Sequence, residues 1–96
     1  MSAVDEHSIE APMGVVAVRQ SDGAVVISWT GPPQAEFKVS RQTGEGRWQV
    51  VGRTRHRQIE DGGAPATGRV PVYAVTARRE GTVSNEAHSD GAAQRR

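Results

Sequence analysis

The chain has 96 residues, a formal net charge of +1 and no cysteine, so it has room for one domain and for neither a disulfide nor a thiolate metal site. A hydrophobic fraction of 35% and a charged fraction of 24% are ordinary for a globular chain, and they favour neither nucleic acid nor a membrane as partner. No segment approaches the roughly 20 apolar residues of a membrane-spanning helix, and the first ten residues lack the apolar centre of a secretory signal. Intracellular and extracellular compartments are both compatible with these features. We expect a cytoplasmic protein only if this chain is complete rather than excised from a longer one.

Hydrophobic periodicity is missing from both ends of the chain. Residues 1–10 and 90–96 show neither strand-like alternation nor a helical repeat. We therefore predict a flexible N-terminal lead at 1–10, one ordered domain at 11–89 and a flexible C-terminal tail at 90–96.

Three strands are predicted in the first half of the ordered region. The first passes through Val16 and Val18, after which Asp22-Gly23 forms a tight turn. The second covers 24–30 and ends where two consecutive prolines remove backbone donors, and the third covers 36–41.

The second half predicts four more strands, at 47–51, around Ile59, at 70–78 and at 83–87. In the first of these the alternation is unclear, because Val50 and Val51 are adjacent. The segment 61–68 contains three glycines and a proline and is expected to be a loop. No apolar 3.6-residue repeat of useful length predicts a helix.

In two of the strands, at 25–29 and 73–77, apolar or aromatic residues recur at every second position. Residues two apart in a strand point to one face, so both strands are expected to bury one face in a shared core. The predicted core residues are Val25, Ile27, Trp29, Phe37, Val39, Tyr73, Val75 and Ala77. Seven short strands at this spacing predict an all-β fold, an antiparallel sandwich with Greek-key connections.

Turn and core residues recur in the order Pro12, Asp22-Gly23, Val25-x-Ile27-Ser28-Trp29, Phe37-x-Val39, Tyr73-x-Val75-x-Ala77 and Gly81-x-x-Ser84. This order and spacing resemble a fibronectin type III domain of the bacterial type over about residues 11–89. The resemblance implies a seven-stranded immunoglobulin-like β-sandwich that serves as a noncatalytic interaction or spacer module beside other domains. It also implies that the Tyr73 hydroxyl bonds to nearby backbone, as in a tyrosine corner.

The sequence departs from that family at two places. Arg41 stands where the family often has an aromatic residue, and the loop before Tyr73 has glycines in place of a leucine-containing corner. No Arg-Gly-Asp triplet occurs, so the integrin binding of some family members is not carried over.

No pattern in the chain predicts catalysis. The three histidines fall in the lead, in a loop and near the last strand, without cysteine or carboxylate partners at metal-binding spacing. Glu60 and Asp61 are neighbours in a strand and would point to opposite faces, which prevents shared acid–base work. We therefore assign no catalytic, metal or cofactor-binding residue and expect no enzyme and no cofactor.

The loops at 31–35, 53–57 and 78–82 are expected at one end of the sandwich, because the chain reverses at every connection. The candidate partner-binding residues in these loops are Pro32, Pro33, Gln34, Arg53, Arg55, His56, Arg57, Arg78 and Arg79. Five arginines together indicate an anionic partner, which is an acidic protein segment, a phosphorylated motif or the phosphates of a nucleic acid. The alternative is that these are solvated side chains in a chain whose basic residues, apart from Lys38, are all arginine.

The leading functional hypothesis is an interaction or spacer module that binds a protein or contacts a tethered neighbouring domain, as a monomer. The loops lack aromatic side chains on which bases could stack, so nucleic acid is not expected, and neither is a membrane. The alternative hypothesis is a carbohydrate-binding accessory domain of a polysaccharide-active enzyme, for which Trp48 is the available aromatic platform.

Overall fold

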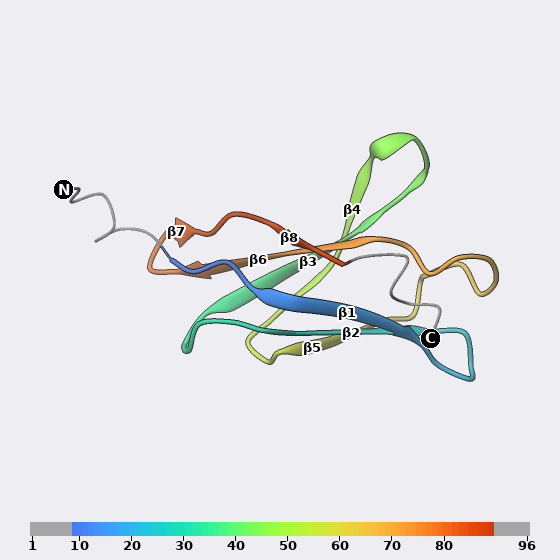
Figure 1. The fold of residues 1–96 in the computed structure, drawn as a ribbon, viewed down its shortest axis with the longest axis horizontal. Helices are drawn as coiled ribbons and strands as arrows, with labels where there is room; N and C mark the ends of the chain where they lie inside the picture. Colours follow the sequence, from blue (N-terminus) through green and yellow to red (C-terminus); the bar gives the residue numbers. More distant parts are fainter. Residues whose placement is uncertain (1–8, 90–96) are drawn as a thin grey trace.

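A computed structural model describes residues 9–89, which form two antiparallel sheets packed against each other (Figure 1). The smaller sheet has the order β1-β2-β5, with β1 at Met13–Arg19, β2 at Val25–Thr30 and β5 at Gln58–Asp61. The larger sheet has the order β4-β3-β6, and two short strands pair with the far side of β6. Its strands are β3 at Glu36–Gln42, β4 at Trp48–Thr54, β6 at Tyr73–Arg79, β7 at Thr82–Val83 and β8 at Ala87–His88. The predicted all-β sandwich is confirmed.

The core lies between the sheets and follows from strand alternation. All eight residues predicted for the core are buried, and none is more than 4% exposed. Trp29 and Phe37 meet edge to face, with ring centroids 5.5 Å apart. Gly31 is required beside them, because a Cβ at this position would come within 2.7 Å of the Phe37 ring. Strands from both sheets thus contribute to one apolar interior.

The predicted last strand is divided in two. Ser84 lies between β7 and β8, and its Oγ accepts a hydrogen bond from the Ala77 backbone N–H at 2.9 Å. Ser89 accepts the Tyr73 N–H in the same way. Side-chain hydroxyls here replace carbonyl acceptors of a continuous ladder, so residues 9–89 form eight strands where seven were predicted.

β4 is longer than predicted and contains a β-bulge. Val39 lies opposite Gly52, whereas the next residue of β3, Ser40, lies opposite Val50. Val51 is therefore the extra residue, and it packs against the core while Val50 is exposed. The bulge explains why two valines stand side by side in one strand.

The boundary residues of the predicted domain lie close to the limits of the described region. Ile9 belongs to the predicted lead, yet it is buried and packs in the core cluster. The rest of the predicted lead, except residue 10, and the whole predicted tail at 90–96 lie outside the described residues. A 3-10 turn, η2 at Gly44–Gly46, closes the β3–β4 hairpin, which Figure 1 shows projecting beyond the sandwich.

Candidate functional site

The loops at 31–35, 55–57 and 80–81 meet at one end of the sandwich, named here the loop end. Two arginines bridge these loops. Arg57 Nη2 lies 3.3 Å from both the Gly31 and Pro32 carbonyl oxygens, and Arg79 Nη1 donates to the Pro33 carbonyl at 2.9 Å. The three loops are therefore held together by guanidinium groups that bond to main-chain oxygens.

The five predicted arginines consequently fall into two groups. Arg57 and Arg79 each use one guanidinium nitrogen to bond to main-chain oxygens of the loop at 31–35. Arg53, Arg55 and Arg78 are exposed, and within residues 9–89 their side chains make no hydrogen bond or ion pair. These three guanidinium groups are the ones free to bind a partner.

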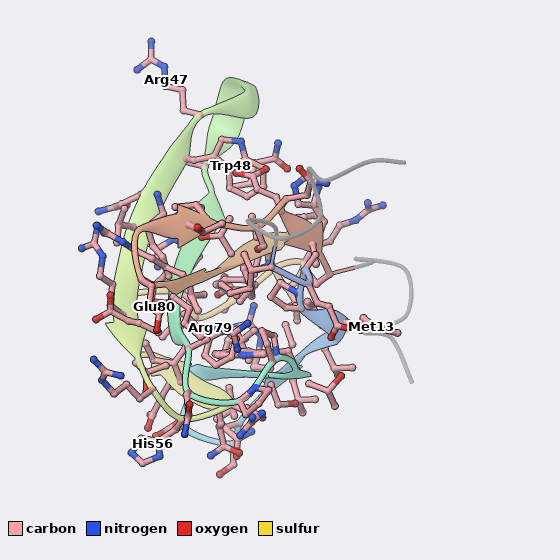
Figure 2. The ribbon with its side chains drawn as sticks, turned by 90° about the vertical axis from the view of Figure 1, so that its left-hand side faces the viewer. Met13, Arg47, Trp48, His56, Arg79 and Glu80 are labelled. Atoms are coloured by element: carbon pink, nitrogen blue, oxygen red, sulfur yellow. The ribbon has the colours of Figure 1, made fainter. Side chains whose placement is uncertain are left out.

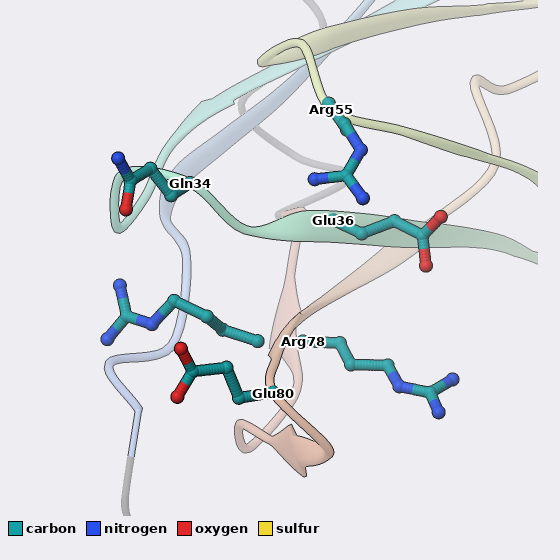
Figure 3. A pocket seen from close by; sticks show the side chains of 6 residues that line it. Gln34, Glu36, Arg55, Arg78 and Glu80 are labelled. Carbon is teal, nitrogen blue, oxygen red and sulfur yellow. The ribbon is translucent and has the colours of Figure 1, made fainter.

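A hollow of about 320 Å³ opens between the loops (Figure 3). Its lining residues are Gln34, Glu36, Arg55, Arg78, Arg79 and Glu80. The lining contains three cationic side chains and two carboxylates, so it has an excess of one positive charge. This loop-end hollow contains four of the nine predicted partner-binding residues.

A second, smaller hollow of about 80 Å³ lies on the outer face of the larger sheet and is named here the sheet-face hollow. Its lining residues are Glu36, Lys38, Arg53, Thr76, Arg78 and Val83. Glu36 and Arg78 line both hollows, so the two form one continuous surface. Arg53 was predicted in a loop but lies within β4, because β4 extends to Thr54. Lys38 was not predicted as a site residue, because it stands in the middle of a strand.

Four predicted residues lie at the loop end without lining either hollow: Pro32, Pro33, His56 and Arg57. Pro32 is buried beneath the loop, whereas Pro33 is exposed. His56 is exposed at the turn after β4, where its backbone N–H donates to Thr54 Oγ1 (Figure 2). Gln34 has a positive φ of 58°, a left-handed conformation that directs this side chain to the edge of the loop-end hollow.

Trp48 lies at the far end of the larger sheet from His56 (Figure 2). Its indole ring contacts the His88 ring, with centroids 5.3 Å apart, and Trp48 is 39% exposed. The neighbouring Val50 is half exposed. The structure therefore places this aromatic residue on the sheet surface and away from the loop end.

The opposite end of the sandwich carries a buried polar cluster that the sequence did not predict. Arg41 Nη1 lies 2.7 and 2.6 Å from the two Asp61 carboxylate oxygens, and these side chains are only 12% and 4% exposed. The Tyr73 hydroxyl donates to Asp61 Oδ2 at 2.7 Å. The predicted backbone bond of Tyr73 is thus wrong, because the hydroxyl donates instead to the carboxylate of Asp61, on the other sheet.

The cluster changes the acidity of the tyrosine. Burial, and then the hydrogen bond to Asp61, raise the pKa of Tyr73 well above its ordinary value. Asp61 also accepts the Gly63 backbone N–H at 3.1 Å, which fixes the start of the following loop. The arginine at 41 that departs from the family pattern thus has a structural role.

Arg19 holds the same end of the molecule. Its guanidinium donates to the carbonyl oxygens of Gly23 and Pro65 at 2.9 and 2.7 Å, and it contacts those of Gly68 and Arg69 at 3.3 and 3.5 Å. The long glycine-rich loop is thereby tied to β1. No sequence motif indicated the bonds to this loop, because their acceptors are main-chain oxygens 46–50 residues away from Arg19.

Residues 9–89 contain no group of three or more histidine, cysteine, aspartate or glutamate side chains placed to hold a metal ion. None of the helices within the same residues is long and apolar enough to span a membrane.

No known family model matches the sequence, and no curated protein matches it either. Solved structures do match in fold. An Fn3-like protein from Clostridium thermocellum has a TM-score of 0.73 and 21% identity, over 85% of this chain and 90% of that one. FN3tt has a TM-score of 0.69 and 13% identity, over 84% of this chain and 89% of that one. The protein of a myokine structure has a TM-score of 0.53 and 18% identity, over 84% of this chain and 95% of that one. The chain therefore has the fibronectin type III fold, as its turn and core residues predicted.

Proposed function

We propose that this domain is a noncatalytic interaction module that holds an acidic protein segment at the loop end. The observation that carries the proposal is the division among the arginines. Arg55 and Arg78 line the loop-end hollow and are exposed, and neither makes a hydrogen bond or ion pair to another described residue. A domain of this fold is typically noncatalytic, and a rigid sandwich is suited to presenting loops for recognition.

The expected binding mode uses the two groups of arginines differently. Arg79 is held by the Pro33 carbonyl and offers its remaining donors from a fixed position. Arg55 and Arg78 supply exposed guanidinium groups that can each form paired hydrogen bonds to a carboxylate. Glu36 and Glu80 in the same lining limit the excess of positive charge. Binding is therefore expected to be moderate in affinity and to weaken with added salt.

The test uses a fluorescent peptide of alternating aspartate, glutamate and serine residues, with binding measured by anisotropy at low and high salt. The double variant Arg55→Gln/Arg78→Gln is expected to bind about tenfold more weakly or worse, because two charge-assisted contacts are lost. Arg47→Gln/Arg69→Gln is the matched control, since both arginines are exposed and line neither hollow. Equal loss in both double variants, or no binding by the parent domain, would contradict the proposal.

A second candidate function is carbohydrate binding, and the exposed indole of Trp48 supports it. A sugar ring would stack on Trp48 and displace or adjoin His88. Titration of neutral polysaccharides should then change the fluorescence of the parent and leave that of Trp48→Phe unchanged. An identical response in the two proteins would exclude Trp48 as the platform.

A further inference from the structure

Two like charges face each other on the outer face of the larger sheet. Lys38 of β3 lies directly opposite Arg53 of β4 in the strand register. Like charges at directly opposite positions destabilise a sheet. Neither side chain has a hydrogen bond or an ion pair with any other residue in 9–89. The fold therefore places two like charges opposite each other, and neither side chain is held in an ion pair within these residues.

The surroundings of this pair gather further donors. Arg78 lines the same sheet-face hollow, as does Thr76, which lies opposite Lys38 on β6. Glu36 is the only carboxylate in the lining, and its partner in the register is Arg78. Three cations against one carboxylate leave two positive charges around a space of about 80 Å³. The hollow thus has the charge to match one compact dianion.

We propose that the sheet-face hollow binds the phosphate group of a phosphorylated peptide, with Lys38, Arg53 and Arg78 as its cationic ligands. The phosphate carries nearly two negative charges at neutral pH and has three acceptor oxygens, which suits two guanidinium groups and an ammonium group. A bound dianion would also remove the repulsion between Lys38 and Arg53. A carboxylate, with one charge, would compensate only part of it.

For the acidic residues that flank the phosphorylated one, this inference rests on the proposed function. The sheet-face hollow joins the loop-end hollow through Glu36 and Arg78. A peptide with a phosphorylated residue in the first hollow would place its flanking acidic residues near Arg55 in the second. The domain would then bind phosphorylated acidic segments more tightly than unphosphorylated ones.

The first experiment measures thermal unfolding of the parent, Lys38→Gln and Arg47→Gln in chloride and in inorganic phosphate at equal ionic strength. In chloride, Lys38→Gln is expected to melt about 1–4 °C higher than the parent, because the repulsion is gone. Phosphate should raise the melting temperature of the parent and of Arg47→Gln, but not that of Lys38→Gln. Arg47 lies on the same hairpin and lines neither hollow, so it controls for loss of charge (Figure 2).

The second experiment compares three acidic peptides that differ at one position, which is phosphoserine, glutamate or serine. The phosphoserine peptide is expected to bind at least about tenfold more tightly than the other two, and Lys38→Gln should abolish this difference. Binding of all three peptides with equal affinity, dependent on Arg55, would overturn the phosphate site and leave the proposed function intact. Failure of every peptide to bind would overturn both. A lower melting temperature of Lys38→Gln in chloride, or a phosphate response equal to that of the parent, would also overturn the site.

Discussion

The two ends of the sandwich differ in how some of their arginines are bonded. At one end, Arg41 is paired with a buried carboxylate and Arg19 contacts four main-chain oxygens. At the loop end, Arg55 and Arg78 are exposed without such partners. The chain is rich in arginine throughout, so abundance does not distinguish the ends. What distinguishes Arg55 and Arg78 from Arg19, Arg41, Arg57 and Arg79 is that their guanidinium donors are not already bonded inside the fold.

The largest effect that tests this contrast is expected for Arg41→Met. Its removal leaves the Asp61 carboxylate buried without its cation, and breaking such a pair costs about 3–5 kcal/mol. Urea unfolding should show this loss in the free energy of unfolding. The double variant Arg41→Met/Asp61→Asn should recover part of it, because the unpaired charge is gone. A loss below about 1 kcal/mol for the single variant would mean that water solvates the Asp61 carboxylate and that the ion pair with Arg41 does not stabilise this end.

Tyr73→Phe is expected to lower the free energy of unfolding by about 1.5–3 kcal/mol, because the Asp61 carboxylate loses the hydrogen bond that the Tyr73 hydroxyl donates. The variant also tests pH dependence. The raised pKa means that folded Tyr73 keeps its proton where the unfolded chain loses it, so stability should fall as pH rises above about 10. Tyr73 is the only tyrosine, so Tyr73→Phe should show a shallower fall in this range. Parallel curves for the two proteins would show that the hydroxyl is not buried in this way.

Arg79→Met should give a smaller effect of about 1 kcal/mol, through loss of its hydrogen bond to the Pro33 carbonyl. Hydrogen exchange should become faster in the loop at 31–35 and stay unchanged in the glycine-rich loop at 62–72, which Arg19 holds. Faster exchange in both loops would indicate general destabilisation rather than a local role for Arg79.

Arg55→Met is expected to change the free energy of unfolding by no more than about 0.5 kcal/mol, because the side chain is exposed without an internal partner. The same substitution should weaken binding of the acidic peptide. A substitution that weakens binding without lowering the free energy of unfolding identifies a recognition residue. A stability loss comparable to that of Arg79→Met would place Arg55 among the structural arginines.

Much of the fold could be predicted because strand alternation is a local property. Val25, Ile27 and Trp29 share a face for the same reason that Tyr73, Val75 and Ala77 do, and all are buried. The division of the last strand could not be predicted, since it depends on the Ser84 hydroxyl reaching a specific N–H of β6. Several of the candidate loop residues do meet around one hollow, because the order of short connections fixes which loops share an end.

The sheet-face hollow could not be found in the same way. Whether Lys38 faces Arg53 depends on the register of the β3–β4 hairpin, and a shift of one residue would send the side chain to the other face. The bulge at Val51 sets that register, and two adjacent valines are compatible with more than one position for it. The pairing of Arg41 with Asp61 likewise joins strands of different sheets.

The sequence by itself determined the all-β class, the alternating core around Trp29 and the gathering of loops at one end, because each depends on neighbours along the chain. The tertiary structure decided which arginines are structural and which are free. That decision depends on donors and acceptors up to 50 residues apart meeting within hydrogen-bonding distance, as Arg19 and Arg69 do. Such distances are set by sheet register and loop packing, which local patterns do not encode.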